Sequence, residues 1–264
     1  MGWVLDLDGV IWLGDTPIPG AARAVERLRA AGEEVVFCTN NSSEPVTAVE
    51  AKLARHGIPA AGAVVGSALA AASLVATGER VLVCGGPGIV EAVTGAGAEV
   101  VREGPADVVV VGFDRGFDYE RLRVASAAVR DGARLLGTND DATYPTAEGV
   151  LPGGGSLLAA VEVASGVRAT VAGKPYGPMA ALLRERLGPV GLMVGDRPDT
   201  DGRFAAALGY PFALVLTGVT THDAELDPRP DHVAADLAEL VERSLGPAGP
   251  LEGRRTPTPQ SRGG

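Results

Sequence analysis

The chain has 264 residues, enough for one large domain or two modest ones, and its hydrophobic content of 46% can fill a real core. A net charge of −10 and an aromatic content of 4% argue against nucleic acid as a partner, because the chain offers neither a basic surface nor stacking platforms for bases. A small anionic substrate needs only local positive potential, so the composition does not argue against one.

Cys38 and Cys84 each end an apolar run, which is typical of buried thiols and not of a disulfide framework. Asp6 and Asp8 interrupt the apolar stretch that a secretory signal would need. No apolar run reaches membrane-spanning length without a charge, a glycine or a proline. We therefore expect a reduced, cytoplasmic protein without a membrane partner.

The first predicted element is a buried strand at Trp3–Leu5, followed by two acids, Asp6 and Asp8, and by a sharp turn at Gly9. Acids at the carboxyl end of a central strand stand where open α/β sheets bind ligands. One acid can attack an electrophile while the other transfers a proton, and together they can bind a divalent cation. A helix cap plus a turn aspartate would explain the same residues.

A short flap over residues 10–20 comes next, followed by a helix at 21–31, a strand at 33–38 and a helix at 44–56. Between the last two lie five consecutive hydroxyl and amide side chains, Thr39-Asn40-Asn41-Ser42-Ser43. One of them is enough to cap a helix, so the others favour an anion site at the helix N-terminus.

Strands and helices alternate again between residues 66 and 172, which predicts a second sheet covered by helices. The predicted helices cover 67–77, 88–95, 119–130 and a segment ending at 165, and the strands cover 80–84, 99–102, 107–112 and 134–137. Two glycine-rich stretches lack the spacing of known phosphate loops. We interpret Gly85–Gly88 as a turn and Gly153–Gly155 as a tight approach or a hinge.

The last part of the chain predicts a return to strand–helix units, with polar residues at the turns. These units are a helix at 178–187, a strand at 190–194, a helix ending at 208, a strand at 212–216 and a helix at 235–245. Residues 247–264 are rich in Gly, Pro, Ser and Arg, which predicts a disordered tail.

Four polar groups each follow a predicted strand, and the carboxyl ends of parallel strands meet at one edge of a sheet. The groups are Asp6/Asp8, Thr39/Asn40, Lys174 and Asp196/Asp201. The acids at 196, 199 and 201 would repel one another without a cation, and with Asp6 and Asp8 they offer enough hard oxygens for Mg²⁺. The structural alternatives are a surface lysine for Lys174 and a helix cap for the acids at 196–201.

The order Asp6-Leu7-Asp8-Gly9-Val10, Thr39-Asn40-Asn41, Gly173-Lys174-Pro175 and Gly195-Asp196 to Asp201 resembles the haloacid dehalogenase superfamily of phosphohydrolases. The insertion between the second and third motifs is similar to that of the 4-nitrophenylphosphatase and phosphoglycolate phosphatase branch. The resemblance implies an α/β fold: a Rossmann-like parallel-sheet core at 1–66 and 173–246, and an α/β cap domain at 67–172.

The same resemblance implies a role for each motif residue. Asp6 would attack phosphorus to form an aspartyl phosphate, and Asp8 would act as acid and then base while its backbone carbonyl binds the metal. Thr39 and the backbone of Asn40 would bind the phosphate group, and Lys174 would neutralise charge. The remaining implied roles are Mg²⁺ ligation by Asp196 and supporting contacts from Asp201 and Asn41.

We therefore predict a Mg²⁺-dependent phosphomonoesterase for a small phosphorylated metabolite, with the cap providing selectivity. The oligomeric state stays open, with a homodimer paired through the cap as one option. Glycerol phosphate, phosphoglycolate, sugar phosphates, nucleotides and pyridoxal phosphate all remain open. Tyr144 is a candidate for contacting the leaving group, or else a cap-core or turn tyrosine. Asp140 stands where the branch usually has a proline, so the resemblance leaves the choice of substrate open while its implication for the chemistry is unchanged. A phosphomutase, a dehalogenase and a non-catalytic phosphometabolite-binding protein are the alternatives.

Overall fold

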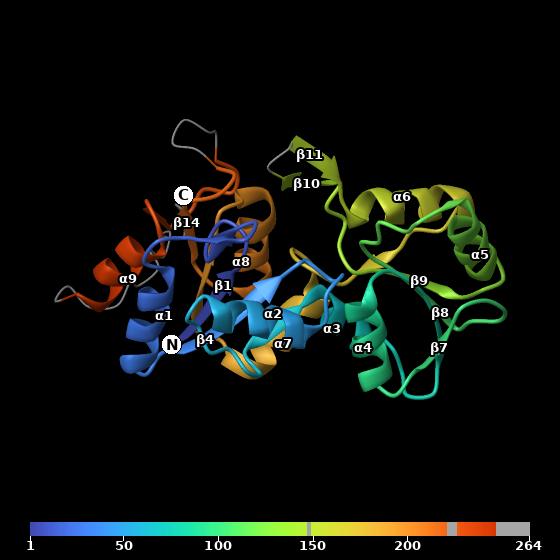
Figure 1. Ribbon diagram of the computed structural model, residues 1–264, viewed down its shortest axis with the longest axis horizontal. Helices are drawn as coiled ribbons and strands as arrows, with labels where there is room; N and C mark the ends of the chain where they lie inside the picture. The colour runs from blue at the N-terminus through green and yellow to red at the C-terminus, as the bar shows by residue number, and fades with distance from the viewer. Residues whose placement is uncertain (147–148, 221–225, 247–264) are drawn as a thin grey trace, which may run out of the picture.

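The computed structural model describes residues 1–146, 149–220 and 226–246, which form two parallel sheets with helices on both faces of each (Figure 1). The larger sheet has six strands in the order β15-β14-β13-β1-β4-β5. Their bounds are β1 Gly2–Asp6, β4 Glu34–Thr39, β5 Val64–Gly66, β13 Gly191–Gly195, β14 Phe212–Val215 and β15 His232–Ala234. All neighbouring pairs run parallel, which puts β1 at the centre with β4 and β13 on either side.

Alternation along β1 sends successive side chains to opposite faces of this sheet. Trp3 and Leu5 pack with apolar residues of α1 (Ala21–Ala30), α2 (Val46–Arg55) and α9 (Leu237–Leu245). Val4 points to the other face, which is covered by α7 (Gly177–Leu187) and α8 (Arg203–Leu208). The sheet is thus buried on both faces, and only its strand ends and loops can carry a site.

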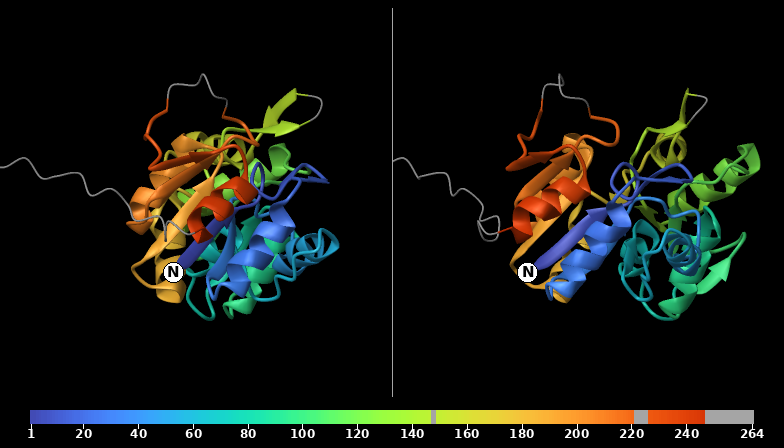
Figure 2. Two further views of the ribbon diagram at one scale, coloured as in Figure 1. Left: turned by 90° about the vertical axis from the view of Figure 1, so that its left-hand side faces the viewer. Right: turned by 60° about the vertical axis from the view of Figure 1, so that its left-hand side comes forward.

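The smaller sheet has five parallel strands in the order β12-β9-β8-β6-β7. They are β6 Arg80–Cys84, β7 Glu99–Val101, β8 Val108–Val111, β9 Arg134–Gly137 and β12 Thr170–Val171. One face packs on α5 (Tyr119–Arg130) and α6 (Gly154–Ser165), and the other packs on α3 (Ser67–Ala72) and α4 (Pro87–Gly95). Figure 2 shows the two sheets as separate lobes, side by side in its right-hand view.

These two sheets confirm the predicted α/β class with a parallel core sheet and a second α/β layer. The division of the chain at residues 67 and 173 stays a prediction, because α3 packs both on α4 of the smaller lobe and on α7 of the larger one. The predicted tail at 247–264 lies outside the described residues. No helix within the described ranges combines the length and apolar content needed to cross a membrane.

Several local predictions differ from the structure. The helix predicted at 67–77 ends at Ala72, and the amides of Leu74 and Val75 after it donate to carbonyls three residues back, as in a turn, and not four residues back. The predicted loop after residue 138 contains a hairpin, β10 (Thr143–Thr146) and β11 (Gly149–Pro152), and the flap contains the short hairpin β2 (Trp12–Leu13) and β3 (Thr16–Pro17). The strands of both hairpins are too short to show an apolar alternation.

The expectation that all four polar groups follow strands of one sheet was wrong for Lys174. This lysine comes after β12, which pairs with β9 at the edge of the smaller sheet. It therefore reaches the larger sheet from the segment that connects the two lobes. Its position depends on how the lobes are joined, which strand periodicity alone does not reveal.

Candidate active site

Three polar groups lie at the carboxyl ends of adjacent strands in the larger sheet. Asp6 is the last residue of β1, Thr39 is the last residue of β4, and Asp196 directly follows β13. Because β1 pairs with both β4 and β13 in parallel register, these three ends are neighbours in space. The structure thus brings together residues that are separated by up to 190 positions in the chain.

Lys174 joins these groups from the other side. Its ammonium nitrogen Nζ lies 2.7 Å from Oδ1 of Asp6 and 2.7 Å from Oδ1 of Asp201. All three side chains are buried, with relative exposures of 2% for Lys174, 9% for Asp6 and 0% for Asp201. Burial alone would lower the pKa of Lys174, but the two carboxylates outweigh it and raise this pKa well above its ordinary value. The lysine is therefore a fixed positive charge next to Asp6.

The carboxylates at this site exceed the positive charge that the chain supplies. Oxygen atoms of Asp6, Asp196 and Asp201 lie within 4.8 Å of one another, and all three residues are buried. Burial together with Asp201 raises the pKa of Asp196 to about 6, and burial raises the pKa of Asp6 as well. Three acids against one ammonium fit a divalent cation with hard oxygen ligands such as Mg²⁺. The carboxylate of Asp8 lies outside this group.

Glycines allow the backbone to approach Asp196 and Asp201 closely. A Cβ atom on Gly218 would lie 1.9 Å from Oδ2 of Asp196, and one on Gly9 would lie 2.5 Å from the same oxygen. Gly9 also has a φ of +80°, so a side chain at this position would strain the backbone of the turn as well as clash with Asp196. Oδ2 of Asp196 accepts a 2.7 Å hydrogen bond from the backbone of Val219, which fixes the orientation of this carboxylate.

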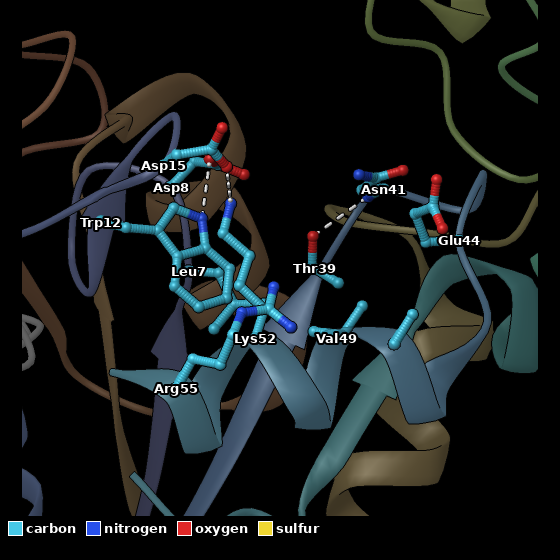
Figure 3. Close-up of a pocket in the computed structure, with 11 residues that line it drawn as sticks. Leu7, Asp8, Trp12, Asp15, Thr39, Asn41, Glu44, Val49, Lys52 and Arg55 are labelled. Carbon is cyan, nitrogen blue, oxygen red and sulfur yellow. Dashed lines mark hydrogen bonds and ion pairs between the residues drawn. The ribbon is translucent and has the colours of Figure 1, made fainter. Parts of the chain in front are cut away.

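Asp8 lies beside a pocket of about 300 Å³ between the flap, α2 and the loop after β4 (Figure 3). Its side chain is exposed to this pocket, yet the surrounding protein removes enough water to raise its pKa, against the opposing effects of Lys52 and Trp12. The indole nitrogen of Trp12 donates a 3.1 Å hydrogen bond to Oδ1 of Asp8. The sequence pattern predicts only that Trp12 lies in a flap, although an indole four residues after the acid is a usable signal for this contact.

The loop after β4 is held by its own side chains. Oγ1 of Thr39, which is 4% exposed, accepts a hydrogen bond of 3.1 Å from the backbone of Asn41. The side chain of Asn41 in turn accepts bonds from the backbone and hydroxyl groups of Ser43, at 3.0 and 2.7 Å. Thr39 and Asn41 both line the pocket beside Asp8, so an anion near Asp6 would lie next to this ordered loop.

Asn40 connects this loop with the smaller lobe. Its amide oxygen accepts a 2.8 Å bond from the backbone of Lys174, and its amide nitrogen donates at 3.0 Å to the carbonyl of Lys174 and at 3.0 Å to Asp141. Asn139 donates a 2.8 Å bond to the backbone carbonyl of Asn40. Asp141 was not singled out as a site residue from the sequence, because its partner is 101 positions away.

Tyr144 lies on β10, and its described contacts are all within the smaller lobe. Its hydroxyl oxygen accepts a 3.2 Å hydrogen bond from Nη2 of Arg115, and its ring meets that of Phe113 edge-on at 5.2 Å. The hairpin rises above the junction of the two lobes (Figure 1). The role predicted for Tyr144 in substrate selection stays a prediction.

Comparisons with known proteins agree with this geometry. A family model described as haloacid dehalogenase-like hydrolase matches residues 3–99, and a second, described as HAD-hydrolase-like, matches residues 171–240. D-glycerol 3-phosphate phosphatase of Mycobacterium tuberculosis is 38% identical, over 91% of this chain and 71% of that protein. The 5'-nucleotidase YutF of Bacillus subtilis is 36% identical, over 91% of this chain and 97% of that protein.

Solved structures show the same fold, and two of them are complexes with calcium or magnesium. The p-nitrophenyl phosphatase from Archaeoglobus fulgidus superposes with a TM-score of 0.87 at 30% identity, covering 92% of this chain and 98% of that one. A glycerol phosphate phosphatase from Mycobacterium tuberculosis in complex with magnesium gives a TM-score of 0.83 at 36% identity, covering 90% of this chain and 75% of that one. The chain therefore belongs to the haloacid dehalogenase-like hydrolase family, which uses Mg²⁺, and is a phosphatase of the branch that includes the 4-nitrophenylphosphatases.

Proposed function

We propose that the protein is a Mg²⁺-dependent phosphomonoesterase that cleaves small phosphorylated metabolites through an aspartyl-phosphate intermediate. The observation that carries the proposal is the ammonium of Lys174, held 2.7 Å from both Asp6 and Asp201 inside the protein. A buried cation beside a buried carboxylate at the end of a central strand favours attack on an anionic substrate, because it offsets the repulsion between two negative charges.

In the first step a carboxylate oxygen of Asp6 attacks phosphorus, and the bond from phosphorus to the leaving oxygen breaks. Asp8, in its protonated form, gives its proton to that oxygen, so the alcohol leaves neutral and Asp8 becomes a carboxylate. The raised pKa of Asp8 supports the acid role. Thr39 and the backbone after it would hold the phosphate oxygens, and Lys174 would stabilise the charge that builds up on them.

In the second step Asp8 accepts a proton from a water molecule whose oxygen attacks the phosphorus of the intermediate. The bond between phosphorus and Asp6 breaks, and inorganic phosphate and the free carboxylate result. Asp201 and Asn40 hold Lys174 in place throughout, through its ammonium and its backbone respectively. Mg²⁺, held by Asp6, Asp196 and the backbone carbonyl of Asp8, would neutralise charge on the phosphate oxygens.

The substrate class follows from the relatives and from the site's surroundings. The relatives are named for glycerol phosphate and for 5'-nucleotides, both of which are soluble phosphomonoesters. The pocket beside Asp8 is small and lined largely by polar side chains, which favours a small hydrophilic leaving group. We infer that the natural substrate is a small metabolite of this kind, and that the smaller lobe acts as the cap that selects it.

Phosphate release from a panel of compounds, each with Mg²⁺ and with EDTA, tests the proposal. The panel contains 4-nitrophenyl phosphate, glycerol phosphate, phosphoglycolate, a sugar phosphate, a nucleotide and pyridoxal phosphate. We expect release from 4-nitrophenyl phosphate and from at least one metabolite, lost with EDTA and restored by Mg²⁺. Binding without release would favour a non-catalytic protein, and an isomerised sugar phosphate without free phosphate would favour a mutase. Size-exclusion chromatography of the same sample tests the predicted homodimer.

A further inference from the structure

We propose that Trp12 is a positioning residue for Asp8: its indole N–H holds one oxygen of the Asp8 carboxyl group, and Lys52 fixes the indole from behind. The proposal rests on the proposed function, in which Asp8 transfers the proton to the leaving oxygen. It adds a residue outside the four motifs, and it explains what the flap hairpin contributes to the reaction.

The backbone of Trp12 is tied to the turn that carries Asp8. The amide of Gly9 donates a 2.8 Å hydrogen bond to the carbonyl of Trp12, and the amide of Trp12 donates at 3.2 Å to the carbonyl of Leu7. Asp8 and Trp12 also form an isolated β-bridge. The carboxyl group and the indole that donates to it at 3.1 Å are therefore parts of one small, internally bonded unit.

The indole ring is fixed from several sides. Trp12 is 4% exposed, although it lies in a short surface hairpin. The ammonium of Lys52 lies 4.4 Å from the centre of the ring, and His56 packs against it at 5.8 Å. Figure 3 shows the indole nitrogen directed at Asp8, with Lys52 rising from α2 beside the ring. A cation over the ring withdraws electron density, which makes the N–H a stronger donor.

Lys52 also ties the hairpin to α2. Its Nζ atom donates a 2.6 Å hydrogen bond to the carbonyl of Gly14 and lies 3.2 Å from Oδ1 of Asp15. The chain has only two lysines, and the other one, Lys174, holds Asp6. One lysine thus fixes the predicted nucleophile directly, and the other fixes the predicted acid through Trp12.

The hydrogen bond from Trp12 determines which oxygen of the Asp8 carboxyl group carries the proton that is transferred. An N–H donor on Oδ1 needs a lone pair there, so a proton on the carboxyl group goes to Oδ2. Without the donor the carboxyl group can rotate, so its proton is aligned with the leaving oxygen in only a small fraction of its orientations. Proton transfer requires an aligned donor, whereas phosphate binding does not. Removing the Trp12 N–H should therefore lower the reaction rate only for substrates whose leaving oxygen needs that proton.

Trp12→Phe removes the N–H and keeps a ring for Lys52 to cover. The chain offers a matched control in Trp3→Phe: Trp3 is 1% exposed on β1, and its indole nitrogen has no hydrogen-bond partner among the described residues. Both variants lose a similar volume from the apolar cluster to which Trp3 and Trp12 belong. Only Trp12→Phe loses a donor to Asp8, so the pair separates positioning from packing.

The experiment compares kcat/KM for phenyl phosphate with that for 4-nitrophenyl phosphate at saturating Mg²⁺. The two compounds have similar shapes, but phenol, with a pKa near that of tyrosine at about 10, needs protonation to leave, whereas 4-nitrophenolate leaves as a stable anion. We expect Trp12→Phe to lower kcat/KM about tenfold for phenyl phosphate and at most about twofold for 4-nitrophenyl phosphate, within the total that general acid catalysis contributes. Trp3→Phe should leave the ratio unchanged.

An equal fall for both compounds, or no change for either, would overturn the proposal. If Trp12→Phe does not fold, Trp12→Met answers the same question, because it also removes the indole N–H and its flexible side chain fills part of the space that the ring leaves. It should shift the ratio of the two kcat/KM values in the same direction as Trp12→Phe. A wild-type protein that releases phosphate from neither compound would overturn the proposed function, and that result appears before any variant is made.

Discussion

The strand ends of the larger sheet and the β10–β11 hairpin of the smaller lobe are built in opposite ways. At the strand ends Lys174, Asp6 and Asp201 are buried, and each is held by direct contacts of 2.7 Å. On the hairpin every described residue of β11 is exposed, including Val150 at 68% and Leu151 at 40%. Fixed charges suit a reaction that is the same for every substrate, whereas an exposed surface can change with the substrate.

The largest effect that would sharpen this comparison is expected for Asp6→Asn. It removes the predicted nucleophile at nearly constant size, so phosphatase activity should fall at least about 1,000-fold. Asp199→Asn is the matched control, because Asp199 is an exposed acid near the same edge whose one ion pair among the described residues is with Arg197, at 3.2 Å. Steady-state rates and a thermal melt check both variants, and activity in a folded Asp6→Asn protein would exclude Asp6 as the nucleophile.

Lys174→Met should lower activity about 100-fold and the free energy of unfolding by about 3 kcal/mol in the absence of metal. The change leaves Asp6 and Asp201 as buried carboxylates without their cation. Denaturant unfolding with EDTA measures the stability term, and the same rate assay measures the activity. An active and equally stable variant would show that the buried ion pair is dispensable. The fixed charges at the strand ends would then not distinguish this region from the exposed hairpin.

Magnesium should stabilise the folded protein more at about pH 7.5 than at about pH 5. Asp196 has a pKa raised to about 6 from its ordinary value of 3.8, so its protonated form favours the metal-free fold. The stability that protonated Asp196 adds to the metal-free protein is fully present below about pH 4 and is lost as the pH rises through about 6. The metal needs the deprotonated form, so it gains affinity over the same range. Melting temperatures with Mg²⁺ and with EDTA at both pH values check this; equal gains would contradict it.

The smallest effect is expected on the hairpin. Tyr144→Phe removes a hydroxyl that accepts a bond from Arg115, so it should change the ranking of metabolite substrates by about threefold while leaving 4-nitrophenyl phosphate turnover nearly unchanged. Tyr119→Phe, at an 80% exposed position of α5, is the matched control. An unchanged ranking across the metabolite panel would remove Tyr144 from substrate selection.

Much of the larger lobe could be predicted from the sequence, because its strands carry long apolar runs and its polar residues follow them directly. The strand at Trp3–Leu5 and the acids after it are an example, since β1 ends at Asp6. The edge strands β5 and β15 and both short hairpins were not predicted. Each has only two to four residues per strand, too few for a periodic signal.

By itself the sequence determined which residues could do the chemistry: two acids before a glycine, a hydroxyl and amide cluster, a rare lysine and a second group of acids. Only the tertiary structure decided which of them touch. Lys174, in the connection between the two sheets, donates a hydrogen bond to Asp6. Asp141 accepts one from Asn40, 101 positions away, and Asp8 accepts one from Trp12 in the flap hairpin. Local patterns report how a segment buries its own apolar side, whereas contacts between charged side chains depend on how separate segments pack.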